Sequence, residues 1–121
     1  MRQLLLLTVF VLAMAPSVVS AEHQHAKRWY QERWCAKNFG MEQAQVSKIY
    51  DCVTQDHVIE FDYAEQWYEA IGESLYYAMQ TGKRAGIVLI LEEESDLRHW
   101  VKLTETIRHY DLPIDAWRTS P

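Results

Sequence analysis

The hydrophobic and polar positions predict alternating helices and strands. Over 64–81, hydrophobic residues recur every three or four positions, which is typical of an amphipathic helix. The continuous apolar run at 85–91 is typical of a strand buried on both faces. Ser95 is a suitable N-cap for the helix that follows. The predicted elements are a helix at 25–38, strands at 46–53 and 58–63, a helix at 64–81, a strand at 85–91, a helix at 95–109 and a strand at 112–118.

This order predicts an α/β domain. The first two strands are separated only by a polar turn at 54–57, so we expect an antiparallel hairpin. The helix at 64–81 lies between two strands, and such a connection makes the strands parallel. The sequence therefore predicts a mixed sheet flanked by helices.

The first 21 residues have the layout of a secretory signal peptide. Met1 and Arg2 precede an apolar run from Leu4 to Ala15, and small residues lead to Ala21. Removal of residues 1–21 leaves a single domain at 22–121 with 11 basic and 17 acidic residues, a net charge of −6. We therefore expect a small periplasmic or secreted protein without stable membrane association. The negative charge argues against nucleic-acid coating by bulk charge.

The two cysteines fit an oxidising compartment. Cys35 and Cys52 both lie in the predicted mature chain, and an even count favours one disulfide. Free thiols or a bound metal are the alternatives, although two isolated cysteines make no zinc-type cluster.

The hairpin brings acidic residues together. If 54–57 is the turn, Val53 faces Val58, and Asp51 then lies opposite Glu60. Side-chain alternation places Asp62 on the same face as Glu60. Like charges at this separation are unfavourable unless solvent screens them or a cation bridges them, and Mg²⁺ prefers such oxygen ligands. A solvated acidic surface is the alternative interpretation.

The segment YDCVTQDHVIEFDYAEQWYEAIGESLYYAMQTGKRAGIVLILE resembles the core of the PD-(D/E)XK nuclease-like superfamily, which has the restriction-endonuclease-like fold. The resemblance implies an αβββαβ core and an Mg²⁺-dependent phosphodiesterase that acts on DNA or another nucleic acid. It assigns the catalytic strand acids to Asp51 and Glu60. Glu32 matches an acidic residue that some members carry on the first helix, and it joins Asp51, Glu60 and Asp62 as a candidate metal ligand.

The sequence departs from the family pattern at the lysine of Glu-x-Lys. Asp62 occupies that position, and the next helix begins with Glu65 and Gln66, of which Gln66 is a further candidate for the site. Lys48 has the wrong strand parity, and Lys83 lies at the opposite end of the sheet, so no replacement lysine is apparent. The expectation is a metal-dependent nuclease, weak or degenerate. The alternative is a non-catalytic periplasmic or secreted interaction protein that retains the fold.

Three other features have simpler interpretations. Glu92 ends the buried strand at the edge of the sheet where ligands gather in open α/β folds. His23 and His25 follow the predicted cleavage point, where we expect a disordered tail; a transition-metal site shared with the new amino terminus is the alternative. Glu73 belongs to a polar stripe on the long helix, which indicates a solvated surface.

Overall fold

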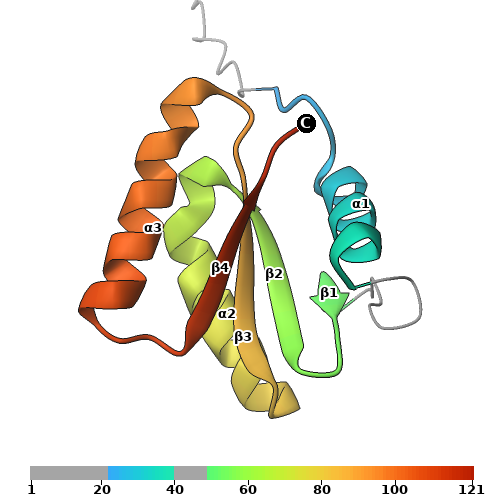
Figure 1. The fold of residues 1–121 in the computed structure, drawn as a ribbon, viewed down its shortest axis with the longest axis vertical. Coiled ribbons are helices and arrows are strands. Elements are labelled where there is room, and N and C mark those ends of the chain that lie inside the picture. Colours follow the sequence, from blue (N-terminus) through green and yellow to red (C-terminus); the bar gives the residue numbers. More distant parts are fainter. Residues whose placement is uncertain (1–21, 40–48) are drawn as a thin grey trace, which may run out of the picture.

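The strands form one mixed sheet in the computed structural model, which describes residues 22–39 and 49–121 (Figure 1). Within this described part, four strands lie side by side in the order β1-β2-β3-β4. The first pair is antiparallel, and the other two pairs are parallel. The strands are β1 (Cys52–Val53), β2 (His57–Tyr63), β3 (Arg84–Ile90) and β4 (Ile114–Thr119).

Helices cover both faces of the sheet. Side chains of β2 and β3 alternate between the faces, as strand geometry requires. Ile59 and Val88 pack on the face that meets α1, whereas Ile87 and Leu89 pack on the face that meets α2 and α3. The helical elements are α1 (Lys27–Phe39), η1 (Ala64–Gln66), α2 (Trp67–Thr81), η2 (Glu94–Asp96) and α3 (Leu97–His109).

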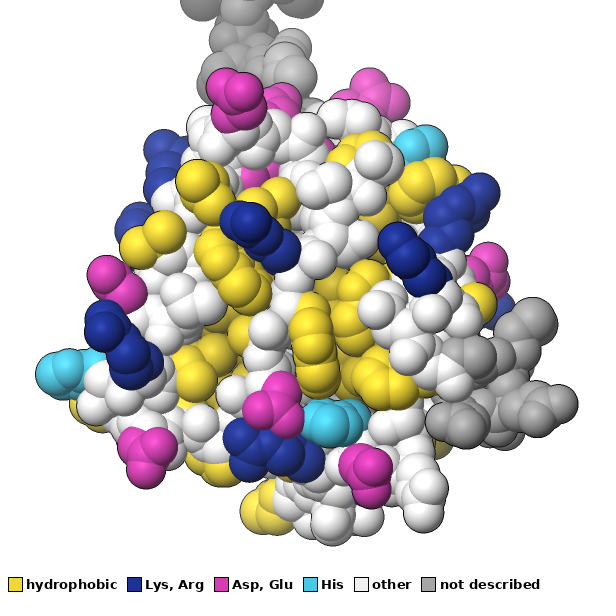
Figure 2. Space-filling model, in the orientation of Figure 1, with side chains coloured by type: hydrophobic (Ala, Val, Ile, Leu, Met, Phe, Trp, Pro, Cys, Tyr) yellow, Lys and Arg dark blue, Asp and Glu magenta, His cyan; other side chains and the backbone are white. Residues whose placement is uncertain are grey.

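The face that carries α1 is the less completely covered one. In Figure 1, α1 lies to one side of the sheet while α2 passes behind the strands. Figure 2 shows hydrophobic side chains gathered at the centre of the front face, over the strands, with Lys and Arg side chains around them. This view also shows that acidic side chains are not concentrated at the centre of that face.

The predicted hairpin register is confirmed. Val53 pairs with Val58, and Cys52 pairs with Ile59. The turn is closed by a backbone hydrogen bond from the N–H of Thr54 to the carbonyl of His57 at 2.9 Å. Because β1 starts at Cys52, the edge of β2 beyond Ile59 has no strand partner on that side among the described residues.

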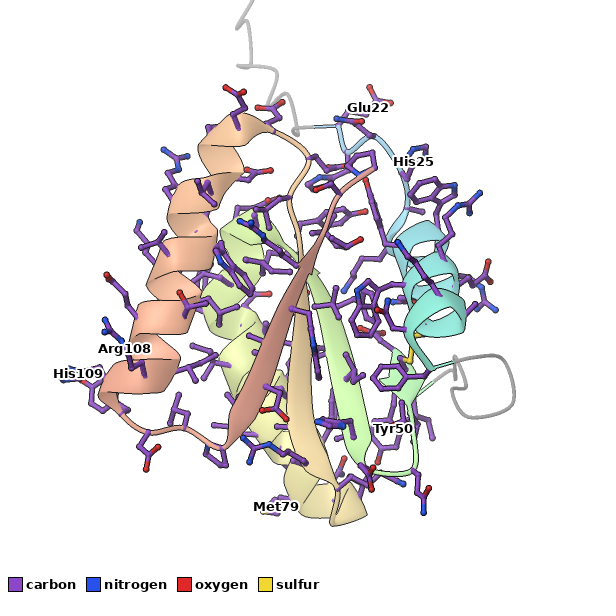
Figure 3. The ribbon with its side chains drawn as sticks, in the orientation of Figure 1. Glu22, His25, Tyr50, Met79, Arg108 and His109 are labelled. Carbon is purple, nitrogen blue, oxygen red and sulfur yellow. A yellow bond between two sulfur atoms is a disulfide. The ribbon has the colours of Figure 1, made fainter. Side chains whose placement is uncertain are left out.

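The predicted disulfide is also confirmed. Cys35 of α1 is bonded to Cys52 of β1, and both side chains are buried (Figure 3). The bridge attaches α1 to the edge of the sheet next to Asp51. The structure therefore supports the coarse prediction: an α/β domain with a mixed sheet, flanking helices and one disulfide.

One local prediction is wrong. Ser95 does not cap α3, because it lies inside η2. A reciprocal capping box lies instead at the start of η2, where Glu93 and Asp96 each accept a hydrogen bond from the other's backbone N–H, and α3 itself has no side-chain cap. The chain therefore enters α3 through a short 3₁₀ turn, and the acidic side chains accept the amides of that turn.

Two predictions fall on other parts of the chain. The signal peptide at 1–21 and the start of the first predicted strand, 46–48, lie outside the described residues. The prediction of a strand over 49–51 is wrong, because β1 is limited to Cys52–Val53 and the side chain of Asp51 takes the backbone N–H of Phe61. Within the described ranges, no helix combines the length and the apolar character that a membrane crossing requires.

Candidate metal centre

Two acidic side chains of β2 are buried on the face of the sheet that meets α2. Glu60 is 5% exposed and Asp62 is 3% exposed. They pair in register with Ile87 and Leu89 of β3, which belong to the hydrophobic cluster on the same face. Because side chains two residues apart in a strand point to the same face, both carboxylates are directed toward α2 and lie next to these hydrophobic side chains.

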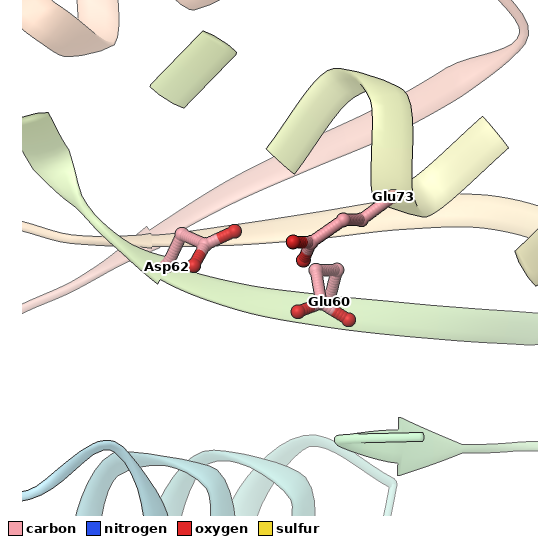
Figure 4. Close-up of side chains that lie close together, drawn as sticks. All are labelled: Glu60, Asp62 and Glu73. Carbon is pink, nitrogen blue, oxygen red and sulfur yellow. The ribbon is translucent and has the colours of Figure 1, made fainter. Parts of the chain in front are cut away.

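A third carboxylate comes from α2. Glu73 reaches toward β2, so that Glu60, Asp62 and Glu73 each offer one oxygen atom within 4.8 Å of the other two (Figure 4). Ligand oxygens of Mg²⁺ lie about 2.1 Å from the metal, hence up to about 4.2 Å apart. Small side-chain rotations would therefore let these three oxygens share one cation.

Asp51 adds a fourth acidic side chain at the edge of the sheet. It precedes β1, and continuation of the hairpin register places it opposite Glu60. Its Oδ2 accepts a hydrogen bond from the backbone N–H of Phe61 at 2.9 Å. Asp51 thereby fills the position that a longer β1 would take along β2.

Lys27 brings a positive charge to the same site. It is the first residue of α1, and its Nζ lies 3.3 Å from Asp62 Oδ1. Burial lowers the pKa of Lys27, but the charges of Asp62, Asp51 and Glu60 outweigh that effect and raise it above its ordinary value. Lys27 is therefore a fully charged ammonium at neutral pH.

The site holds more negative charge than its lysine can compensate. Burial, followed by the charge of Asp51 and a hydrogen bond with Glu73, raises the pKa of Glu60 far above its ordinary value. Burial likewise raises the pKa of Asp62 to about 6, against the opposing effect of Lys27. Both buried carboxyl groups therefore favour their protonated forms as long as no cation is bound.

One buried oxygen of the site has no partner. Among the described residues, Asp62 Oδ2 makes no hydrogen bond, although its other oxygen is paired with Lys27. Buried carboxylate oxygens are normally satisfied, so this orphan atom indicates room for a further positive ligand. The donor set, made only of carboxylate oxygens, suits a hard divalent cation.

The structure brings together three of the five residues that the sequence predicts for the site. Asp51, Glu60 and Asp62 converge as expected. Glu32 does not take part: it is exposed and pairs with Arg28 one turn earlier on α1, at 2.8 Å. Gln66 lies in η1, and within the described part no hydrogen bond or ion pair links its side chain to these acids.

Lys27 and Glu73 were missed, although weak cues exist for both. Lys27 precedes Trp34 by seven residues, a spacing that places both on the buried side of α1. Glu73 adjoins Ser74, and both Ala70 and Ser74 are buried against the sheet. Small residues beside an acid on one helix face allow close approach to a strand. The prediction that Glu73 lies on a solvated surface was therefore wrong.

Comparison with known proteins adds no relative to this picture: no family model, no curated protein and no solved structure matches the chain. The function must therefore be argued from the geometry of the site.

Proposed function

We propose that this protein binds a divalent metal ion, Mg²⁺ or Mn²⁺, at Glu60, Asp62 and Glu73, and that it hydrolyses phosphodiester bonds there. The observation that carries the proposal is the convergence of these three carboxylates, one of which, Asp62, has a buried Oδ2 without a hydrogen-bond partner among the described residues. When bound, the metal supplies Lewis-acid chemistry, polarising a phosphoryl oxygen and lowering the pKa of a water molecule.

The residues of the chain would divide the remaining tasks. Glu60, Asp62 and Glu73 hold the cation, and Asp51 adds negative charge beside it while it holds the strand edge. Lys27 supplies the fixed positive charge that the sequence motif lacks, through its ion pair with Asp62. An ammonium in this position stabilises the negative charge that develops on a phosphoryl group, a contribution on the order of 10²–10³ in rate.

The described elements agree with part of the PD-(D/E)XK resemblance, although two strands rather than three lie between α1 and α2 in the described residues. They include a helix, an antiparallel strand pair with Glu60 on β2 and Asp51 directly before β1, a second helix and a parallel strand. The proposal retains the αβββαβ core as the finer description of the fold and DNA or another nucleic acid as the substrate. Lys27 on α1 would replace the lysine that the family carries next to Glu60.

The disulfide is consistent with the proposed location. Cys35 and Cys52 form a bridge in the structure, and such bridges persist in the periplasm and outside the cell. We therefore propose that the protein acts as a nuclease in the periplasm or outside the cell.

Metal binding is tested on protein stripped with EDTA. Mn²⁺ titration followed by electron paramagnetic resonance should give one site, and thermal unfolding should shift upward as the metal saturates the folded state. Glu60→Gln, Asp62→Asn and Glu73→Gln should each weaken binding. Glu69→Gln is the matched control, because Glu69 is an exposed residue one turn earlier on α2.

Hydrolysis is tested on plasmid and single-stranded DNA with the same variants. Cleavage that requires the metal and is lost in Glu60→Gln, but not in Glu69→Gln, would establish the enzyme. Lys27→Met should lower the rate while leaving metal binding in place. Failure to bind Mn²⁺ or Mg²⁺ at millimolar concentration would remove the proposal.

The alternative is a non-catalytic exported interaction protein that retains this fold. The observation in its favour is the burial of Glu60 and Asp62, at 5% and 3% exposure, which restricts the approach of a polymer. Metal binding without cleavage of either DNA substrate would favour this second function.

A further inference from the structure

Glu92 binds the segment that precedes α1 and the first turn of α1. Its Oε2 accepts hydrogen bonds from the backbone N–H of Gln24 at 2.8 Å and from the hydroxyl of Tyr30 at 2.7 Å. Its Oε1 lies 2.6 Å from Nδ1 of His23, and its backbone carbonyl accepts a bond from the side-chain amide of Gln24. Both oxygens of one nearly buried carboxylate thus hold residues that lie 62 to 69 positions earlier in the chain.

A second set of contacts holds the same segment from β2. The hydroxyl of Tyr63 donates to the carbonyl of His25 at 2.7 Å, and the ring of His23 stacks on the ring of Tyr63. Nε2 of His23 lies 3.0 Å from Glu65. The expectation of a disordered tail around His23 and His25 was therefore wrong. Figure 1 shows this segment crossing the end of the sheet before it enters α1.

Lys27 lies between the residues that Glu92 binds. His23 and Gln24 precede it, and Tyr30 follows it by less than one turn of α1. The first turn of α1 is therefore fixed on both sides of the lysine, and this placement brings its Nζ to Asp62. Figure 3 shows His25 just before the start of α1.

We propose that Glu92 is a positioning residue for Lys27. By binding His23, Gln24 and Tyr30, it keeps the ammonium group of Lys27 next to Asp62. Glu92 is not a member of the acidic group and touches none of its carboxylates among the contacts described. Although burial opposes its ionisation, hydrogen bonds from Tyr30, His23 and Gln24 hold the pKa of Glu92 below its ordinary value. Only the consequence of this placement for catalysis rests on the proposed phosphodiesterase function.

The placement of Lys27 is tested in metal-free protein by amine labelling. Lys27 and Lys37 lie on the same helix, and mass spectrometry after brief acetylation reports the rate at each. Lys37 is exposed and serves as the internal reference. In Glu92→Gln, the labelling of Lys27 should rise about threefold or more, because an amine released from its ion pair reacts faster. The rate at Lys37 should not change.

Two variants make this test decisive. Glu94→Gln removes an exposed acid two residues away and should leave the labelling of Lys27 unchanged. Tyr30→Phe removes one hydrogen bond to Glu92 and should raise the labelling in the same direction, so it decides the question if Glu92→Gln does not fold. Equal labelling of Lys27 in wild type, Tyr30→Phe and Glu92→Gln would overturn the proposal.

A double-mutant cycle then separates positioning from general structural support. Glu92→Gln should lower the rate of DNA cleavage without weakening Mn²⁺ binding, and it should have no further effect in a Lys27→Met background. An undiminished effect in that background would show that Glu92 does not act through Lys27. The labelling experiment requires neither metal nor DNA cleavage. It therefore still tests the positioning of Lys27 if the protein proves not to be a phosphodiesterase.

Discussion

The carboxylate of Asp51 accepts the backbone N–H of Phe61 at 2.9 Å, beyond the last residue pair of the hairpin. In an antiparallel pair, alternate residues direct their N–H groups toward the neighbouring strand. β1 stops short of Phe61, so a side chain takes the place of the missing backbone partner. The same carboxylate contributes to the high pKa of Glu60. Asp51 therefore has two roles: it pairs with the backbone at the edge of β2, and its charge affects the pKa of Glu60.

Asp51→Ala and Asp51→Asn should differ in stability. Asparagine retains an oxygen that can accept the Phe61 N–H, whereas alanine leaves this amide without a partner at the strand edge. A lost hydrogen bond to a charged group costs about 1.5–3 kcal/mol. We expect Asp51→Ala to lower the free energy of unfolding by this amount and Asp51→Asn by less. Urea unfolding in EDTA at neutral pH measures both, and equal losses would contradict the role of the hydrogen bond.

Metal-free protein should lose stability as pH rises. The folded-state pKa of Glu60 and of Asp62 is raised above the unfolded values of 4.5 and 3.8, mainly by burial. Between the unfolded and folded pKa values the native state binds more protons, so the free energy of unfolding falls with increasing pH. For Asp62, with a folded pKa of about 6, the loss is on the order of 3 kcal/mol and falls between about pH 4 and 6.

The contribution of Glu60 extends this loss through neutral pH. Urea unfolding in EDTA from pH 4 to pH 8.5 measures how the free energy of unfolding changes with pH. Glu60→Gln should make this change smaller at the upper end of the pH range. Saturating Mn²⁺ should reverse the trend, because deprotonated carboxylates bind the metal. Stability that rises with pH in EDTA would show that these carboxyl groups are not buried together.

The sequence was sufficient for the long helix, the buried strand and the pairing across the hairpin, but not for the extent of β1 or the turn before α3. A polar turn of four residues fixes which residues face each other, so Val53–Val58 and the neighbouring Asp51–Glu60 relationship follow from counting. The long helix and the buried strand at 85–91 are likewise encoded by periodicity and by an apolar run. These features depend on short separations along the chain.

Lys27 and Glu73 depend instead on how helices pack on the sheet. The disulfide at Cys35 attaches α1 to β1, but it does not determine which residues of α1 turn toward Asp62. The contacts of Glu92 with His23 and Gln24 join residues separated by 69 and 68 positions, and no local sequence pattern predicts them. Long-range polar contacts of this kind become visible only in the folded chain.

Gly86→Ala and Gly72→Ala should change stability in opposite directions. A Cβ at Gly86 would lie 2.9 Å from Cγ1 of Ile59 and 3.0 Å from the ring of Trp117, in the middle of the sheet. Overpacking of this kind costs about 1–3 kcal/mol. Gly72 lies within α2 with open space around it, and alanine there should stabilise the protein by about 0.5–1 kcal/mol. Thermal and urea unfolding measure both, and a neutral Gly86→Ala would contradict the close packing of β3 between its neighbours.

The Cys35–Cys52 bridge should resist reduction in the native state and contribute strongly to stability. Both side chains are almost completely buried, so a thiolate reagent reaches the sulfurs only after local opening. The bridge closes a loop over a separation of 17 residues, for which the chain-entropy model gives about 3 kcal/mol. We expect dithiothreitol to reduce native protein far more slowly than protein in urea, as followed by thiol titration.

The Cys35→Ser, Cys52→Ser double variant should unfold at lower urea concentration, with hydrogen exchange rising first in α1. Because α1 carries Lys27, rapid native reduction without greater exchange in α1 would show that hydrophobic packing alone holds this helix on the sheet.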